Sequence, residues 1–554
     1  MADAVNELDL FFPRLDPATQ KLGIIVGGSL SKGLDVKLEA SAAVEEMAVG
    51  RYVIIEGQHN RFFGMVTDIR LEATNPAIQS MPPDVSDPFL REAYQGTTVF
   101  GTIHVSPMLI LDEQTEEPRP VKTIPGHFAD VRAATEEDVN LVFGPEDEEH
   151  FYIGQPIDME AIPINVNLGR MVERSVGVFG KSGTGKSFLT RILLAGLIQK
   201  HAAVSLIFDM HNDYGWEVQT ESRYPVKGLQ QLFGKSRVAI FTLDEESSRR
   251  RNIRPDYVVT MRWEDITPED LEMLKITLDL SDQMIGAAYT LRRTWGKNWV
   301  KELLEADKDK MDALLENSNV IRSSVDALSR RLDRLTRFDF IRDSWRGDSA
   351  ERILQYLDKG ISVVLEFGRY GNALEAYILV ANYLTRRIHH MYVERMESAL
   401  GNKAAEPRPL VIVIEEAHKF LDPQIARQTI FGIIARELRK YNVTLLVVDQ
   451  RPSGIDEEVM SQIGTRVTAL LDNERDISAV LMGVSGAGSL REVLARLDTK
   501  QQALIMGHAV PMPVVVQTRT YDEVFYAAVG AAQTQMEQTD RVNLMRGKEE
   551  EGID

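Results

Sequence analysis

The chain has 554 residues, of which 44% are hydrophobic and 26% charged, a composition typical of a soluble globular protein with three or four structural units. The formal net charge of −20 excludes an overall basic field that would attract nucleic acid, although a ring can still concentrate basic side chains on one inner surface. The absence of cysteine excludes disulfides, cysteine–zinc sites and thiol nucleophiles.

Short runs of β-type residues fill the first part of the chain, from about residue 18 to 112. Glycines and a proline-rich stretch separate these runs, which are Lys21–Val26, Tyr52–Glu56, Phe62–Arg70 and Thr97–Val105. Short strands with turn signals between them predict a small all-β barrel. The acidic start of the sequence is unlike a signal peptide, and no apolar run reaches the ~18 residues of a membrane span. We therefore expect a cytoplasmic protein with no membrane partner.

Two acidic stretches that contain proline follow this region. Asp112–Pro118 and Gly144–Glu149 are rich in Asp and Glu, and such runs usually form solvated linkers or loops. We therefore expect residues 1–150 to comprise the N-terminal β-barrel and an acidic linker.

From about residue 160 the pattern changes to buried strands that alternate with helical stretches. Continuous apolar runs of this kind belong in the middle of a parallel sheet that is covered on both faces. The runs are Val176–Gly180, Val204–Asp209, Ile361–Glu366, Leu410–Glu415 and Val443–Asp449. They predict an α/β fold for this part of the chain.

A helix-rich insert, at about Thr267–Leu357, separates the second of these runs from the third. Thr267 and Pro268 form a typical helix start, with an N-cap followed by proline at the first helical position. The arginines of the insert alternate with acids, which favours a solvated helical face over a DNA contact. We expect the core to comprise residues 151–255 and 358–520, the insert residues 256–357, and a helical tail residues 521–554.

The sequence Gly180–Ser187 fits the P-loop pattern G-x-x-x-x-G-K-[ST] at every fixed position. An apolar strand precedes it and a helical stretch follows it, as the motif requires. In a P-loop, backbone N–H groups surround the phosphates, the lysine contacts the β- and γ-phosphates, and the hydroxyl binds Mg²⁺. We therefore expect ATP and Mg²⁺ as cofactors. The expected nucleotide-binding residues are Gly180, Ser182, Gly183, Thr184, Gly185, Lys186 and Ser187, with Lys186 also catalytic and Ser187 also a metal ligand.

Two acids end the apolar run Leu410–Glu415 and follow it directly. A strand that ends in adjacent acids beside a P-loop places one near the metal and the next near the attacking water. We assign Glu415 to Mg²⁺ and Glu416 to general-base catalysis.

Two further strand ends carry polar residues at the edge where open α/β sheets bind ligands. The run Val204–Asp209 leads into a polar segment in which Asp209 and His211 are expected to order the water and metal shell. The run Val443–Asp449 is followed by Gln450, which we expect to sense the γ-phosphate or orient the water. The segment Gly368–Asn372 also follows a strand, and the sequence leaves open whether it contacts DNA or forms a plain surface turn.

Together these motifs resemble those of the HerA family, within the FtsK–HerA superfamily of hexameric DNA translocases. The matching segments are Arg174–Gly180, Glu415–His418, Ala435–Tyr441 and Gln450–Pro452. The family's Asp-Pro-His-Gly-Glu-Tyr signature is altered here to Asp-Met-His-Asn-Asp-Tyr, at Asp209–Tyr214. The resemblance implies a RecA-like P-loop ATPase core with a helical insert, preceded by a small N-terminal β-barrel.

The resemblance also implies that arginines act across a subunit boundary. Arg439 matches the arginine that reaches the neighbour's nucleotide, with Arg436 as its nearby competitor, and Arg174 matches a second arginine at that interface. We expect Arg439 to lie on a helix that spans about Gln424–Tyr441. A cation that favours a helix C-terminus is the alternative interpretation of Arg439.

The resemblance implies an ATP-driven homohexameric ring that acts on double-stranded DNA with a NurA-like nuclease, in DNA-end resection and double-strand-break repair. One alternative is the ATPase subunit of an antiphage defence complex with a separate nuclease or Sir2-like effector. Another is an ATPase scaffold that controls assembly without translocation.

Overall fold

The computed structural model describes residues 21–530, except 84–85, 87, 95–96, 113–114, 158–161, 220–224, 317–319, 403–405, 428, 485 and 499–500. The described chain divides into two compact units. The first contains residues up to Asn167 together with Val467–Arg519, and the second contains Leu168–Arg466 and the residues from Thr520 onward. The division of the chain at residues 150, 255, 357 and 520 stays a prediction, and most of the predicted tail lies outside the described residues.

The first unit begins with a β-barrel, as the sequence predicts. Strands pair in the order β2-β1-β7-β3-β4-β5-β6, and pairing between β2 and β5 closes six of them into the barrel. The strands are β1 (Lys21–Ser29), β2 (Gly33–Leu38), β3 (Tyr52–Glu56), β4 (Arg61–Ala73), β5 (Val99–Asp112), β6 (Thr115–Pro120) and β7 (Asp130–Ala133). Their alternate side chains form an apolar core that includes Val36, Val53, Phe62 and Ile103.

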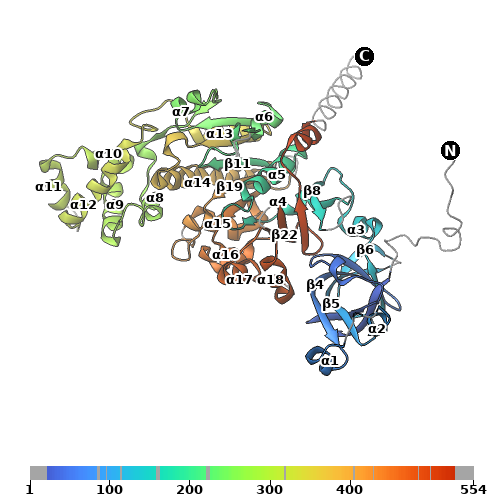
Figure 1. The fold of residues 1–554 in the computed structure, drawn as a ribbon. Helices are drawn as coiled ribbons and strands as arrows, with labels where there is room; N and C mark the ends of the chain where they lie inside the picture. The colour runs from blue at the N-terminus through green and yellow to red at the C-terminus, as the bar shows by residue number, and fades with distance from the viewer. Residues whose placement is uncertain are drawn as a thin grey trace, which may run out of the picture. The chain divides into compact units, whose positions relative to one another are not determined.

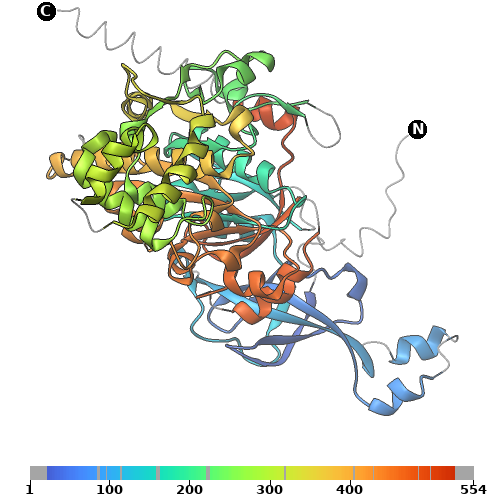
Figure 2. The same cartoon turned by 90° about the vertical axis from the view of Figure 1, so that its left-hand side faces the viewer.

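The paired strands β4 and β5 extend beyond the barrel as a long hairpin (Figure 2). Two short helices, α1 (Pro76–Ser80) and α2 (Pro88–Tyr94), lie in the connection between these strands. The prediction of a linker at Asp112–Pro118 was wrong in part, because residues from Thr115 onward form β6, which pairs antiparallel with β5. The second acidic stretch, Gly144–Glu149, is an exposed loop as expected, between α3 (Glu136–Phe143) and the next strand.

The rest of the first unit contains a second group of antiparallel strands, which pair in the order β22-β23-β8-β9. The elements here are β8 (His150–Pro156), β9 (Ile164–Asn167), α17 (Glu474–Val480), α18 (Ala487–Ala495), β22 (Gln502–Gly507) and β23 (Val514–Thr518). Gly154–Pro156 of β8 therefore pair with Val516–Thr518 of β23, more than 300 residues later in the chain.

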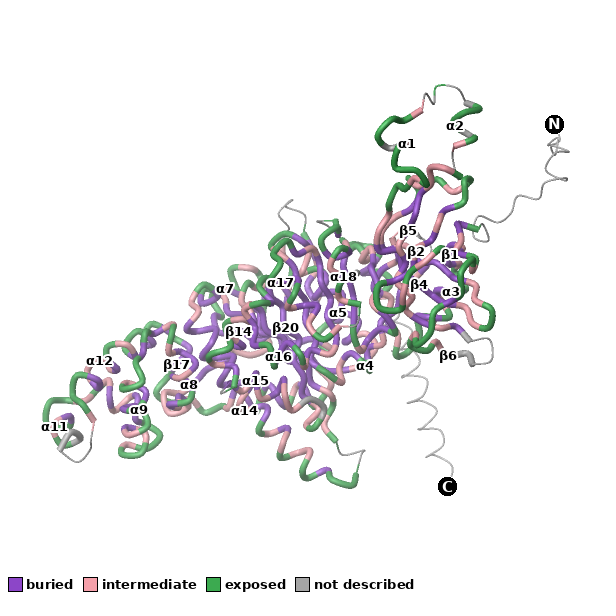
Figure 3. Tube along the Cα trace, turned by 90° about the horizontal axis from the view of Figure 1, so that it is seen from below, coloured by how far each residue is buried: buried purple, intermediate pink, exposed green. Residues whose placement is uncertain are grey.

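The second unit is built on a parallel sheet with the strand order β15-β14-β18-β11-β19-β20-β10. The strands are β10 (Val176–Phe179), β11 (Val204–Asp209), β14 (Val238–Thr242), β15 (Tyr257–Val258), β18 (Ser362–Glu366), β19 (Leu410–Glu415) and β20 (Val443–Asp449). Every residue of β11, β19 and β20 is buried, and Figure 3 shows this buried centre along the tube. β11, β19 and β20 begin and end at the predicted residues.

Helices connect these strands. They are α4 (Leu168–Val172), α5 (Lys186–Gln199), α6 (Leu229–Phe233), α7 (Glu245–Arg250), α13 (Ser349–Asp358), α14 (Leu374–Ser398), α15 (Ile430–Glu437) and α16 (Glu457–Gln462). Short strand pairs also form in this unit, between β12 (Val218–Gln219) and β13 (Pro225–Val226) and between β16 (Met261–Arg262) and β17 (Ile341–Arg342). A further strand, β21 (Thr465–Thr468), lies where the chain passes from the second unit to the first.

The helical insert projects from one end of this sheet (Figure 1). It contains α8 (Pro268–Met273), α9 (Asp282–Trp295), α10 (Trp299–Leu304), α11 (Lys308–Glu316) and α12 (Arg322–Leu332). The predicted start is confirmed, because Thr267 is the N-cap of α8 and Pro268 its first residue. Fully buried Trp299 anchors the insert, and its Nε1–H donates to the carbonyl oxygen of Ile266 at 3.0 Å.

One predicted helix differs from the observed one. We expected a helix over Gln424–Tyr441, but α15 begins only at Ile430 and gives way to a 3₁₀ turn at Leu438–Tyr441. The hydroxyl of Thr429 accepts the backbone N–H of Gly432 at 2.9 Å, so a side chain caps the new helix at this point. Arg439 therefore lies on the 3₁₀ turn after the helix.

Candidate active site

The P-loop lies between strand β10 and helix α5. Gly180, Gly183 and Gly185 have φ angles of 155°, 79° and 87°, a range that glycine adopts without steric cost. A Cβ atom at Gly183 or Gly185 would have no heavy atom within 4 Å, so the backbone conformation, rather than crowding, requires glycine there. The loop thus leads directly into the N-terminus of α5, where a phosphate binds favourably.

Lys186, the first residue of α5, reaches back across the P-loop. Its Nζ donates to the carbonyl oxygen of Lys181 at 2.8 Å, and the Thr184 hydroxyl donates to the same oxygen at 2.8 Å. Burial lowers the pKa of the Lys186 ammonium, while the charges of Glu416, Asp449 and Glu415 oppose that shift. The charges of these acids, at or next to the ends of β19 and β20, therefore act on the lysine.

Glu415, the last residue of β19, is buried. Its Oε1 accepts the Tyr214 hydroxyl at 2.9 Å, and its Oε2 is buried without a hydrogen-bond partner. Burial, reinforced by the charge of Asp209, raises the pKa of Glu415 to about 8. An unpaired buried carboxylate oxygen is costly unless a cation or donor satisfies it.

Glu416 follows directly but lies in a different environment. Its backbone has a left-handed φ of 49°, which turns the chain sharply after β19. Its side chain is 31% exposed, and its Oε1 accepts the Gln450 Nε2–H at 3.2 Å. The two predicted catalytic residues Glu416 and Gln450 are therefore in contact.

Asp449, the last residue of β20, organises the backbone beside this pair. It lies opposite Phe179 of β10 in the parallel register. Its carboxylate accepts the backbone N–H of His418 at 2.7 Å and contacts the His418 Nδ1 at 2.9 Å. The turn that carries Glu416 is thus held from the neighbouring strand.

Asp209, at the end of β11, holds the loop of the altered signature. Its carboxylate accepts the backbone N–H groups of Asp213, Tyr214 and Gly215 at 2.7, 2.8 and 3.3 Å. Burial and the nearby charge of Glu366 raise the pKa of Asp209 to about 7. Asp209 therefore shapes the loop that brings Tyr214 to Glu415.

Glu366 lies beside Asp209, at the same register position of β18. It is fully buried and accepts an Arg251 N–H at 2.5 Å. Burial raises the pKa of Glu366, and the Arg251 charge opposes the shift. The edge of the sheet thus contains buried carboxyl groups at four successive strand ends, those of β18, β11, β19 and β20.

The structure brings some of the predicted residues together and leaves others apart. Lys186, Glu415, Glu416 and Gln450 gather at the P-loop edge, and Asp209 joins them through Tyr214. Ser182, His211 and Arg174 are exposed, and Ser187 is half-buried on the first turn of α5. The Arg439 side chain lies outside the described residues.

Sequence reasoning missed Tyr214, Glu366 and Asp449 as members of this site, and also Tyr377 of α14, whose hydroxyl is hydrogen-bonded to the Glu415 backbone. Asp449 and Glu366 each end an apolar strand, and that signal could have identified them. The two tyrosines could not be recognised in this way, because their role depends on contacts between segments far apart in the chain.

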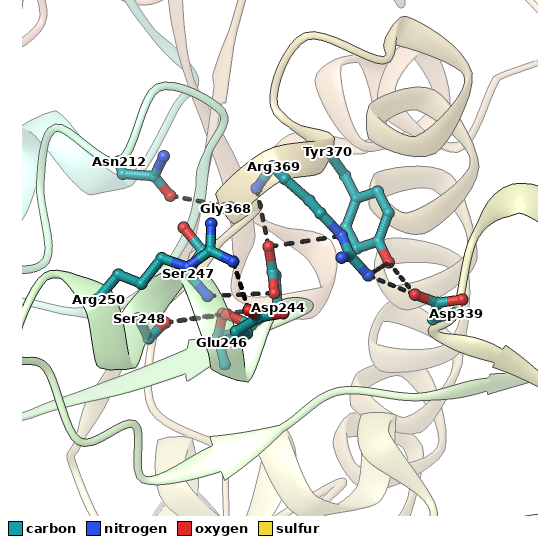
Figure 4. Close-up of polar contacts among 11 residues, drawn as sticks. Asn212, Asp244, Glu246, Ser247, Ser248, Arg250, Asp339, Gly368, Arg369 and Tyr370 are labelled. Carbon is teal, nitrogen blue, oxygen red and sulfur yellow. Dashed lines mark hydrogen bonds and ion pairs between the residues drawn. The ribbon is translucent and has the colours of Figure 1, made fainter.

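The segment that follows β18 has a structural role. The Gly368 N–H donates to the Asn212 side chain at 3.0 Å, and the Arg369 N–H donates to Asp244 at 3.1 Å (Figure 4). The Arg369 guanidinium forms an ion pair with Asp339 and donates to the Tyr370 hydroxyl at 2.8 Å. These contacts favour the surface turn over a DNA-contacting loop.

The residues at this edge fit a hydrated magnesium ion. Within the described chain, no group of three or more His, Asp or Glu side chains is arranged to hold a metal. Mg²⁺ in nucleotide sites needs only one or two carboxylates, because water and substrate phosphates supply its other ligands. The unpartnered Oε2 of Glu415 and the hydroxyl of Ser187 are suitable oxygens.

No helix in the described ranges is long and apolar enough to cross a membrane.

Comparisons with known proteins match both units of the chain. Residues 22–111 match the HAS barrel domain, and residues 151–388 match the central domain of the helicase HerA. The chain is 26% identical to the DNA double-strand break repair helicase HerA of Sulfurisphaera tokodaii over 90% of its own length and 93% of that protein. It is 24% identical to the protein of the same name from Pyrococcus furiosus, over 71% of this chain and 73% of that one.

Among solved structures, VirB4 of Thermoanaerobacter pseudethanolicus aligns with a TM-score of 0.42 at 15% identity, over 68% of this chain and 98% of that chain. The barrel, the P-loop edge and the two domain matches agree with one another. The chain therefore contains a HAS barrel domain and a HerA central domain, and it is an ATP-hydrolysing P-loop enzyme.

Proposed function

We propose that this protein is an ATP-driven motor that acts on double-stranded DNA as a homohexameric ring, with a NurA-like nuclease, in DNA-end resection and double-strand-break repair. The observation that carries the proposal is the convergence of Lys186, Glu416 and Gln450 at one sheet edge. Relatives that match over most of the chain are named as double-strand break repair helicases, which supports DNA as the partner.

The residues of the edge divide the chemistry among themselves. Lys186 neutralises charge on the β- and γ-phosphates, and the P-loop N–H groups orient them. Glu416 accepts a proton from the attacking water, and Gln450, held against it at 3.2 Å, orients that water. Glu415 and Ser187 are the proposed Mg²⁺ ligands, and the ion, when bound, neutralises charge that develops on the phosphate oxygens.

The DNA motor function is tested by ATP hydrolysis and strand displacement with and without duplex DNA. We expect duplex DNA to stimulate hydrolysis, and Lys186→Ala to lose both activities while it still assembles. Hydrolysis that is indifferent to duplex DNA, combined with normal assembly, would instead favour the scaffold function.

The ring is tested by mixing two inactive proteins, Arg439→Ala and Lys186→Ala. If Arg439 acts on the neighbour's nucleotide, some interfaces of a mixed ring pair an intact P-loop with an intact arginine, and part of the activity returns. Lys440→Ala, which removes an exposed cation at the next position, is the matched control and should keep full activity.

Subunit exchange must be confirmed by mass. A mixture that stays inactive is then compared with mixtures that contain wild-type subunits. A loss of wild-type activity in simple proportion to the mutant fraction would remove Arg439 from the proposed role, whereas a steep loss would indicate coupling around the whole ring.

A further inference from the structure

The catalytic end of β19 lacks a strand partner on one side. β19 pairs with β20 as far as Glu415, opposite Val448, but its pairing with β11 stops at Val413. The Tyr377 hydroxyl of α14 replaces the missing strand, because it accepts the Glu415 N–H at 3.0 Å and donates to the Glu415 carbonyl oxygen at 3.1 Å. One side chain therefore satisfies both backbone groups of Glu415.

Tyr377 is itself held firmly. It is fully buried, and its ring packs edge-to-face against Phe367 and Phe420, with centroids 5.1 and 5.3 Å away. Such aromatic contacts fix the ring plane. The hydroxyl position, and with it the backbone of Glu415, is therefore set by the placement of α14.

The same helix is the attachment point of the helical insert. Glu375 of α14 forms ion pairs with Arg334 and Arg337 at the end of the insert, at 2.7 and 3.2 Å. A second contact joins Asn382 of α14 to Asp270 of α8, at 2.7 Å. Ion pairs and hydrogen bonds to the insert thus lie on both sides of Tyr377 along the helix.

Asp270 is a rigid contact point within the insert. It is fully buried and accepts the backbone N–H of Thr267 at 2.8 Å, in the capping box of α8. Arg386 of α14 donates to the same carboxylate at 3.0 Å. A movement of α8 relative to the sheet is therefore transmitted to α14 through a buried, hydrogen-bonded carboxylate.

We propose that Tyr377 is a positioning residue for Glu415, and that α14 makes the position of Glu415 depend on how the helical insert is docked. This rests on the proposed role of Glu415 at Mg²⁺. The insert would then control hydrolysis without contacting the nucleotide.

Tyr377→Phe tests the first part, because it removes the hydroxyl and keeps the packed ring. In the full-length protein we expect kcat for ATP hydrolysis to fall about tenfold or more, with KM for ATP within about twofold. The Mg²⁺ concentration that gives half-maximal activity should rise, since the Glu415 carboxylate loses its fixed position. Tyr392→Phe, which removes the hydroxyl of another buried tyrosine on α14, should leave all three quantities unchanged.

A purely structural role for Tyr377 would give a different result. The melting temperature and the active fraction would fall together, while the Mg²⁺ dependence of the remaining activity would match the wild type. That outcome would overturn the positioning role.

A double-mutant cycle tests the connection to the insert. Glu375→Gln weakens the ion pairs with Arg334 and Arg337, and we expect it to lower kcat and raise the Mg²⁺ requirement in the same direction as Tyr377→Phe. If the two residues act through one pathway, the fold decrease in kcat of the double variant is clearly smaller than the product of the two single fold decreases. Independent effects, which multiply, would overturn the coupling.

Glu415→Gln separates this inference from the proposed function. If it leaves the Mg²⁺ requirement unchanged, the proposed role of Glu415 fails, and the positioning role fails with it. If it raises the requirement and Tyr377→Phe does not, Glu415 keeps its role and only the inference about Tyr377 fails.

Discussion

The barrel of the first unit and the nucleotide-binding edge of the second bury very different side chains. The barrel core cluster contains apolar residues such as Val53 and Phe62, whereas the sheet edge buries Asp209, Glu366 and Glu415. Burial of a carboxyl group costs free energy unless its partners compensate. The barrel core therefore contributes to stability, whereas the buried carboxyl groups of the edge cost stability at the proposed site of ATP hydrolysis.

A buried acid of the first unit makes this contrast specific. Asp138 of α3 is 4% exposed, but two N–H groups of Arg132 contact its carboxylate at 2.7 and 3.2 Å. Burial opposes its ionisation, yet Arg132 and Thr135 lower the pKa of Asp138 below its usual value. Glu415, in contrast, forms no ion pair within the described part of the chain, and its pKa is raised to about 8. A compensated acid indicates structure, and an uncompensated one indicates a site that awaits a ligand.

The largest expected effect is that of Lys186→Ala. We expect ATP hydrolysis to fall by at least about 10³-fold, because the positive charge that faces the phosphates is lost. Phosphate release measures the effect, and sedimentation checks that the protein still assembles. Lys181→Ala changes a neighbouring P-loop lysine at a position that the motif leaves free, and it should retain most of the activity. Near-normal hydrolysis by Lys186→Ala would remove the P-loop assignment.

The next effect separates the adjacent acids. Glu416→Gln should bind ATP with Mg²⁺ normally and hydrolyse it about 10²–10⁴-fold more slowly, because it keeps its shape and loses only its basicity. Glu415→Gln should instead weaken Mg²⁺-dependent nucleotide binding. Titrating a fluorescent ATP analogue at several Mg²⁺ concentrations, beside turnover, distinguishes the two. Tight binding with slow turnover in Glu415→Gln would exchange the roles.

A smaller effect, on stability alone, is expected for Asp138→Asn. Loss of the buried ion pair with Arg132 should lower the free energy of unfolding of the first unit by about 3 kcal/mol, with hydrolysis per folded molecule unchanged. Since the pKa of Asp138 is lowered in the folded chain, its contribution is present near neutral pH and is lost as the pH falls through that lowered pKa. Denaturant titrations should therefore show the two proteins converging in acid, and a constant difference would contradict this account.

The smallest effect is expected for Arg369→Ala. Its guanidinium is already bound to Asp339 and the Tyr370 hydroxyl, and exposed ion pairs contribute little to stability. We expect the stimulation of hydrolysis by duplex DNA to stay within about twofold of the wild type, because an arginine paired in this way contributes little to phosphate binding. A large loss of stimulation, together with a weaker salt dependence than that of the wild type, would make this turn a DNA contact after all.

The central strands of the parallel sheet were the most predictable part of the molecule. β11, β19 and β20 match their predicted bounds because each is an apolar run that ends abruptly in an acid. β14 carries the same signal, Val238–Thr242 with Asp244 shortly after it. It was not predicted, because no sequence motif lies beside it. The P-loop and the Glu416–Gln450 pair followed from sequence, since parallel strands end at one edge.

Other features depend on contacts that local sequence does not encode. Thr115–Pro120 is acidic and contains two prolines, yet it forms strand β6 because β5 offers it a partner. The start of α15 at Ile430 depends on the cap that Thr429 provides. The position of Tyr377 against Glu415 joins residues on different elements, so only the assembled fold reveals it.

The left-handed backbone at Glu416 has a consequence for how the two acids tolerate mutation. A residue other than glycine in this conformation carries a strain of about 1–2 kcal/mol. Many substitutions at Glu416 should therefore lower activity without lowering cellular abundance. Glycine, which relieves the strain, should even increase abundance. Substitutions at Glu415 disturb a buried hydrogen-bonded position and should lower both. A deep mutational scan that scores abundance and activity separately would therefore distinguish two neighbouring glutamates that look equivalent in the sequence.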